Sequence, residues 1–141
     1  MEPTELDDAL LEAYRATHYE VFGVEGLVLR VGVPSEELEG LMASHGVACA
    51  AFVTACNPLG EALGDEVNRA RCADLLADLV AKGRDCLAGH GRHPDGGWEP
   101  EPSLLVLGLD RAAAEALGRR WEQNAIVWAG EDATPELLLL R

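Results

Sequence analysis

Basic residues are scarce in this chain. Among its 141 residues, 11 are Lys or Arg and 25 are Asp or Glu, so the formal net charge is −14. Proteins gain affinity for nucleic acid mainly from Lys and Arg that neutralise phosphates, and an anionic membrane surface repels an acidic protein. The composition therefore predicts neither nucleic-acid nor membrane binding. It leaves open a protein partner with a basic surface.

Long apolar runs are also absent. No segment approaches the roughly 20 consecutive apolar residues that a membrane-spanning helix needs. The first eight residues are acidic, whereas a secretory signal begins with a basic region followed by an apolar one. We therefore expect a soluble, cytoplasmic protein. The chain length and the 48% hydrophobic content predict one globular domain over residues 1–141.

Cysteine is limited to four residues, and none of them forms a Cys-x-x-Cys pair. In a cytoplasmic protein, such cysteines are expected to be reduced and to behave as small buried hydrophobes. We apply this interpretation to Cys49, Cys72 and Cys86. Cys56 lies inside a polar motif and is considered with it below.

Hydrophobic periodicity predicts alternating helices and strands. Apolar residues at helical spacing, together with capping residues, predict helices over residues 4–17, 34–46 and 65–82 and after an Asp110 cap. Short apolar or β-branched runs predict strands over residues 19–22, 26–31, 47–54, 85–88, 103–109, 124–129 and 135–140. Residues 89–100 hold four glycines and two prolines and are expected to form an irregular loop.

Two of these strands, residues 47–54 and 103–109, are almost continuously apolar, so they should be central and covered on both faces. The strands at residues 19–22 and 26–31 should form a hairpin, and residues 135–140 an edge strand. The expected fold class is α/β, a single domain with a mixed β-sheet flanked by helices. The buried side of the helix at residues 65–82 is expected to contain Val67, Cys72, Leu75, Leu76, Leu79 and Val80.

Several polar motifs are spread along the chain. They are Ala13-Tyr14-Arg15-x-Thr17-x-Tyr19, Thr54-Ala55-Cys56-Asn57-Pro58, Glu66-x-Asn68-x-x-Arg71, Trp98-x-x-Glu101-Pro102-Ser103 and Gln123-Asn124-Ala125-Ile126-Val127-Trp128. With these motifs the chain resembles the bacterial family called domain of unknown function 3293. The resemblance implies a fold and a set of motif positions, but no activity.

The chain departs from that family pattern in three places. The family usually has tryptophan where this chain has Cys56 and serine where it has Gly60. Its Glu-Asn pair is often adjacent, whereas Val67 separates Glu66 from Asn68 here. The resemblance therefore says least about Cys56, Gly60 and Glu66.

Polar residues are expected to meet at one edge of the sheet. The end of the strand at residues 47–54 and the starts of the strands at 103–109 and 124–129 share an edge if the first runs antiparallel to the other two. The candidate ligand-binding residues are Thr54, Asn57, Glu66, Asn68, Arg71, Glu101, Ser103, Gln123 and Asn124. Such a rim suits a small polar or anionic ligand, a nucleotide or a metabolite, because helix N-terminal amides and an arginine attract negative charge.

A structural role is the alternative for the same residues. They can cap helices and brace the turn at Pro58, with Arg71 paired to Glu101 or Glu66. Uncharged polar groups at strand ends commonly bond to loop backbone, which favours the structural role for Thr54, Ser103 and Gln123. For Asn57, Arg71 and Glu101 both roles stay open.

Whether the protein is an enzyme is left open by the sequence. Glu101 and Glu66 are candidate acids or bases, and Cys56 and Ser103 are candidate nucleophiles, but no histidine lies at motif spacing from either nucleophile. No cofactor is predicted.

A metal-like pattern is present as well. His90-x-x-His93 is followed by Asp95 and Glu99, but the glycine-rich segment does not fix the spacing of the ligands, so we predict no metal site. Two hypotheses of function result. One is a ligand-binding domain with a pocket at the strand edge, and the other is an acidic protein-interaction module that docks onto a basic partner.

Overall fold

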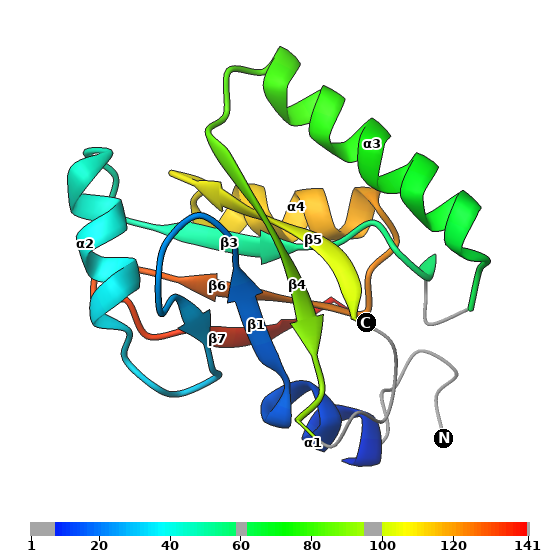
Figure 1. Cartoon of the computed structure of the whole chain (residues 1–141), viewed down its shortest axis with the longest axis horizontal. Helices are drawn as coiled ribbons and strands as arrows, with labels where there is room; N and C mark the ends of the chain where they lie inside the picture. The colour runs from blue at the N-terminus through cyan, green and yellow to red at the C-terminus, as the bar shows by residue number, and fades with distance from the viewer. Residues whose placement is uncertain (1–7, 59–61, 95–99, 141) are drawn as a thin grey trace.

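Seven strands form one strongly twisted sheet in the order β2-β1-β4-β5-β3-β6-β7 (Figure 1). The computed structural model describes residues 8–58, 62–94 and 100–140. Its elements in chain order are α1 (Asp8–Ala16), β1 (His18–Val21), β2 (Val28–Leu29), α2 (Glu36–Ser44), β3 (Ala50–Val53), α3 (Asp65–Ala81), β4 (Cys86–Arg92), β5 (Glu101–Leu107), α4 (Arg111–Arg120), β6 (Ala125–Ala129) and β7 (Glu136–Leu139).

Every pair of neighbouring strands in this sheet is antiparallel. Helix α3 connects β3 to β4, and α4 connects β5 to β6, and each connection skips one strand of the sheet. The joined strands therefore run in the same direction with an antiparallel strand between them. The expected α/β class is confirmed, as is the expectation that β3 runs antiparallel to both β5 and β6. The expected mixed sheet was wrong, because an antiparallel strand lies between the two strands that each helix connects.

Helices cover both faces of the sheet. Because alternate residues of a strand point to opposite faces, Phe52 of β3 packs in the core that contains Met42 of α2, whereas Val53 packs in the core that contains Leu75 of α3 and Leu117 of α4. The four residues of β3 and residues 103–107 of β5 are buried. The prediction that these two strands are central and covered on both faces is confirmed.

Strand β4 runs further than the sequence suggested. The expected irregular loop at residues 89–100 was wrong for its first four residues, because β4 continues to Arg92 between β1 and β5. Gly89 lies opposite Val21, and a Cβ there would lie 2.2 Å from the backbone oxygen of Glu20. Gly89 therefore marks a close approach of β4 to β1, which is a known use of glycine inside a sheet.

In the described part of the chain, two helices begin with a side-chain cap, and one of them is the expected cap Asp110. The side chain of Ser35 accepts a hydrogen bond from the backbone N–H of Leu38 at 3.1 Å, and Asp110 accepts one from Ala113 at 2.8 Å. Helix α3 differs, because its N-cap is Gly64, without a side-chain bond, and Asp65 is its first residue.

The buried side of α3 was only partly predicted. Leu75 and Leu79 are buried as expected, and Asn68 lies on the same side. Val67, Leu76 and Val80 are exposed to 50%, 41% and 61%. Apolar residues occur around much of this helix, so their spacing did not define a single stripe, and the side facing the sheet follows the 68-72-75-79 spacing instead.

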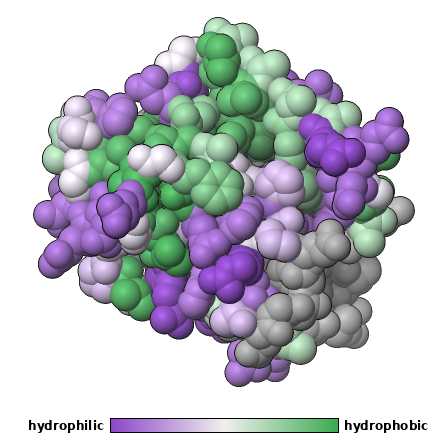
Figure 2. Space-filling view, in the orientation of Figure 1, coloured by the Kyte–Doolittle hydropathy of each residue, from purple (hydrophilic) through white to green (hydrophobic). Residues whose placement is uncertain are grey.

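The surface carries apolar as well as charged residues. Figure 2 shows hydrophobic residues gathered over the middle of one face, with hydrophilic residues around them. Exposed apolar side chains in the region of the β1–β2 hairpin include Phe22, Val28 and Val33. Among the described residues, no helix is long and apolar enough to cross a bilayer.

Candidate functional site

A cavity of about 700 Å³ opens where β3 ends and where β5 and β6 begin. Helix α1 and the first turn of α3 form its sides, and the inner residues include Phe52 and Val127 from the face that α2 covers. The polar and charged residues that line it are Tyr14, Thr17, Tyr19, Thr54, Asn57, Asp65, Asn68, Arg69, Glu101, Ser103, Gln123 and Asn124. Seven of the nine residues proposed from the sequence are among them.

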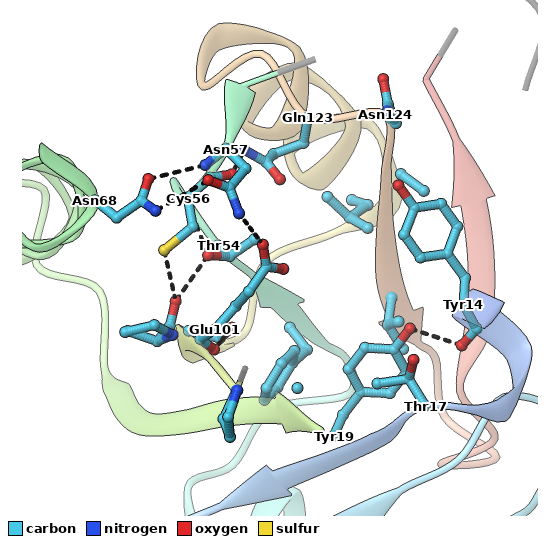
Figure 3. Close-up of a pocket in the computed structure, with 18 of the residues that line it drawn as sticks. Tyr14, Thr17, Tyr19, Thr54, Cys56, Asn57, Asn68, Glu101, Gln123 and Asn124 are labelled. Carbon is cyan, nitrogen blue, oxygen red and sulfur yellow. Dashed lines mark hydrogen bonds between the residues drawn. The ribbon is translucent and has the colours of Figure 1, made fainter. Parts of the chain in front are cut away.

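Asn57 is the centre of the hydrogen-bond network beside this cavity (Figure 3). Its backbone N–H donates to Oδ1 of Asn68 at 3.0 Å, and its Oδ1 accepts from Nδ2 of Asn68 at 3.0 Å and from the backbone N–H of Leu63 at 2.9 Å. Asn57 has a φ of 47°, a left-handed conformation that asparagine tolerates better than most residues. The turn after β3 is thereby fixed to the start of α3.

Three other candidate residues bond mainly to backbone. Thr54 Oγ1 donates to Pro102 O at 2.7 Å, Ser103 Oγ donates to Glu101 O at 2.9 Å, and Gln123 Nε2 donates to the carbonyls of Cys56 and Trp121 at 3.1 Å each. These contacts match the bracing role that the sequence favoured for Thr54, Ser103 and Gln123. They hold the three strand ends in fixed positions around the cavity.

Glu101 supplies a carboxyl group to the cavity wall, at the start of β5. Its Oε2 accepts from Nδ2 of Asn57 at 2.7 Å. Figure 3 shows the carboxyl group pointing into the space that separates Asn57 from Tyr14 and Tyr19. Burial raises the pKa of Glu101 above its ordinary value, and the bond from Asn57 opposes that rise. The carboxyl group of Glu101 therefore loses its proton at a higher pH than that of an exposed glutamate.

This raised pKa predicts a pH-dependent stability. The folded state binds the proton of Glu101 more tightly than the unfolded chain does, so the free energy of unfolding should fall as the pH rises from the ordinary pKa of 4.5 through the raised one. Glu101→Gln removes this titration. In denaturant unfolding at several pH values, its stability relative to the wild type should therefore increase with pH, whereas parallel curves would contradict the assignment.

Aromatic residues form the wall opposite Glu101. The Tyr19 hydroxyl donates to the backbone oxygen of Tyr14 at 2.8 Å, and the Tyr19 ring packs edge-on against Phe52 with centroids 5.3 Å apart. Burial raises the pKa of Tyr19, so its hydroxyl stays protonated. Tyr14, Thr17 and Tyr19 were not proposed as site residues. The sequence signal that could have identified them is the motif that contains all three, which runs from the end of α1 to the start of β1.

Arg71 and Glu66 do not line the cavity. Arg71 follows Asn68 by three residues on α3, and it donates from Nε to Ala55 O at 2.6 Å and from Nη2 to Trp121 O at 3.0 Å. Its carboxylate neighbour is Glu122, at 3.8 Å, and not Glu101 or Glu66. Glu66 is exposed. Helix geometry separates residues 66 and 68 by about 200°, so only one of the two can face the cavity.

The arginine that does line the cavity is Arg69, which the sequence reading missed. It is exposed, and it forms no ion pair with another described residue. One isolated, exposed arginine carries no pattern in the sequence, so only the fold identifies it. Its position gives the cavity a cationic group near its rim.

The hydrogen bonds of the two candidate nucleophiles involve another thiol and backbone carbonyls, with no histidine or carboxyl group among their partners in the described structure. Cys56 Sγ lies against Cys72 Sγ and Pro102 O, and Ser103 Oγ donates to a backbone carbonyl. None of the described residues that line the cavity is a histidine. The carboxyl group of Glu101, the candidate base of the same cavity, bonds to Asn57 and not to either candidate nucleophile in the described structure.

The histidines of the metal-like pattern are placed elsewhere. His90 on β4 bonds to Glu20 on β1, and Arg92 bonds to the other oxygen of Glu20 at 3.1 Å. Asp95 and Glu99 lie outside the described residues. Over residues 8–58, 62–94 and 100–140, no group of three His, Cys, Asp or Glu side chains is placed to hold a metal ion.

Comparison with known proteins identifies the family. No curated protein and no solved structure matches the chain. A family model described as a protein of unknown function, DUF3293, matches residues 53–126, which is more than half of the chain and includes all nine residues proposed from the sequence. The cavity therefore lies largely within the matched segment. The chain belongs to the DUF3293 family.

Proposed function

We propose that this protein binds a small polar ligand, a nucleotide or a metabolite, in the cavity at the ends of β3, β5 and β6. The observation that carries the proposal is the convergence of a partly buried carboxyl group, oriented amides and aromatic rings on one space of about 700 Å³. Ligand sites typically occupy about 300–1,000 Å³ and combine apolar walls with a few oriented polar groups.

The wall chemistry specifies what the ligand should offer. Glu101 uses one oxygen for Asn57, which leaves its other oxygen to accept a hydrogen bond from an N–H or O–H of the ligand. Tyr14, Tyr19 and Phe52 suit a flat or apolar portion. Arg69 at the rim suits an anionic group such as a phosphate or a carboxylate. These features favour a ligand that carries a donor group at one end and an anionic group at the other.

A thermal-shift screen of the purified chain against nucleosides, nucleotides, amino acids and other polar metabolites tests the proposal. Any compound that raises the melting temperature is then titrated by calorimetry against the wild type and two variants. Glu101→Gln is expected to weaken binding at least about tenfold, because a lost charged hydrogen bond costs about 1.5–3 kcal/mol. Arg69→Ala should weaken anionic ligands more than their uncharged analogues.

Glu66→Gln is the matched control. It makes the same chemical change in an exposed carboxylate at the start of α3 that does not line the cavity, and it should leave the affinity within about twofold. An equal loss in Glu66→Gln and Glu101→Gln would contradict the placement of the ligand. A screen without any binder would favour the other hypothesis, an acidic module that docks onto a basic protein, which has the net charge of −14 as its support.

A cytoplasmic location is part of the same proposal. All four cysteines are free thiols, including the two that lie against each other. Neighbouring thiols without a stable disulfide are typical of a reducing compartment, where disulfides are rare and, when they form, transient.

A further inference from the structure

Two of the four cysteines are neighbours in space. Cys56 lies in the turn after β3 and Cys72 lies in α3, and their sulfur atoms are 3.4 Å apart. Both thiols also lie near Pro102 O, at 3.7 Å for Cys56 and 3.5 Å for Cys72. Cys56 is 1% exposed, whereas Cys72 is half-buried and open to a small reagent.

The two segments that carry these thiols are already held together by other contacts. Asn57, next to Cys56, exchanges two hydrogen bonds with Asn68, one turn of α3 before Cys72. A disulfide needs an S–S distance of about 2.05 Å. Side-chain rotation and a small adjustment therefore bring the sulfurs together, because the backbone on both sides is fixed nearby.

The remaining cysteines have a different environment. Burial raises the pKa of Cys49 and of Cys86, and neither lies in contact with another sulfur among the described residues. In the pair, the hydrogen bond from Cys56 lowers the pKa of Cys72 to about 7, and the same bond, with burial, raises the pKa of Cys56. Cys72 is thus the thiol that ionises first, which differs from the inert role expected for it from the sequence.

We propose that Cys56 and Cys72 form a reversible disulfide, so that the turn beside the cavity is a redox modification site. The oxidant is a peroxide. The Cys72 thiolate attacks one peroxide oxygen, the O–O bond breaks, and Cys72 becomes a sulfenic acid while hydroxide leaves. The Cys56 thiol then attacks the Cys72 sulfur, its proton goes to the departing hydroxyl, and water leaves as the S–S bond forms. Two thiols are oxidised, and one peroxide is reduced.

The bond would act directly on the cavity wall. Cys56 lines the cavity, whereas Cys72 does not. Oxidation draws the Cys56 sulfur toward α3 and removes one hydrogen atom from each thiol. Pro102 O keeps its bond from Thr54, so the modification leaves no buried carbonyl without a donor. The inference rests on the thiol geometry and is independent of whether a ligand occupies the cavity.

The test is peptide mapping of the purified full chain. The protein is treated with hydrogen peroxide, remaining thiols are blocked with iodoacetamide, and the non-reduced digest is analysed by mass spectrometry. The expected result is a linked pair of peptides that contain Cys56 and Cys72, with Cys49 and Cys86 alkylated, and loss of the link after reduction. The oxidised chain should melt roughly 5–10 °C higher, since the bond closes a loop of 16 residues.

Two variants make the test specific. Cys72→Ser should abolish the intramolecular link, and the matched Cys86→Ser should retain it. In the wild type, iodoacetamide labelling should accelerate at a lower pH for Cys72 than for Cys49 and Cys86, because the bond from Cys56 lowers the pKa of Cys72 and burial raises the pKa of the other two. Links that involve Cys49 or Cys86, links only between molecules, or oxidation of Cys72 without a link to Cys56 would each overturn the proposal.

Discussion

Replacing Arg71 by alanine should lower the free energy of unfolding by roughly 2–4 kcal/mol. The guanidinium group donates to the carbonyls of Ala55 and Trp121 and lies 5.6 Å from the centroid of the Trp121 ring. Ala55 is fully buried, so its carbonyl would lose a donor in a place that water does not easily reach. Denaturant unfolding monitored by circular dichroism measures the loss.

Arg69→Ala is the matched control for this substitution. It removes the same side chain half a turn away on α3, from an exposed position that makes no ion pair with another described residue. Its stability should change by less than about 0.5 kcal/mol. Arg71→Lys should recover only part of the loss, because an ammonium group cannot donate to both carbonyls as the planar guanidinium does. If Arg71→Ala and Arg69→Ala lower the free energy of unfolding by the same amount, the bracing role of Arg71 is wrong.

Gly89→Ala should destabilise the protein by about 3 kcal/mol or more, because the added methyl group has no room. The new Cβ would lie 2.2 Å from the backbone oxygen of Glu20 and 3.2 Å from Cε2 of Phe52. Backbone oxygen cannot rotate away as a flexible side chain can, so β1 and β4 would have to separate. Thermal unfolding should show a large drop in melting temperature.

Gly40→Ala provides the comparison. Gly40 lies inside α2, and a Cβ there would meet nothing within 4 Å. Alanine favours the helix over glycine by about 0.5–1 kcal/mol, so this variant should be at least as stable as the wild type. A similar loss in both variants would mean that the close approach of β1 and β4 does not limit the residue at position 89.

The order of helices and strands was predictable from the sequence, because each buried strand is short and continuously apolar. The central positions of β3 and β5 followed from that pattern alone. The extent of β4 could not be predicted in this way. Gly89 and Gly91 are typical of loops, and only the pairing with β1 and β5 shows that they lie in a sheet. The buried side of α3 was also hidden, because Val67 and Val80 are as hydrophobic as the leucines that face the core.

For the candidate site, strand ends were more informative than helix positions. Thr54, Glu101 and Gln123 could be placed at one edge because strand direction fixes where a strand ends. Along a helix, by contrast, one position changes the direction of a side chain by about 100°. Arg71 was therefore predicted as a site residue from the sequence, although it braces two loops. Arg69 is the arginine that lines the cavity.

The position of β3 between β5 and β6 has a consequence for synthesis of the chain. Ala50 pairs with Leu107 on one side and with Ala129 on the other, so both partners leave the ribosome long after β3 does. Until then, an apolar strand with two unpaired edges is exposed, and such segments aggregate readily. Contacts between distant parts of a sequence also form slowly. A nascent chain stalled before residue 129 is therefore the species most in need of a chaperone.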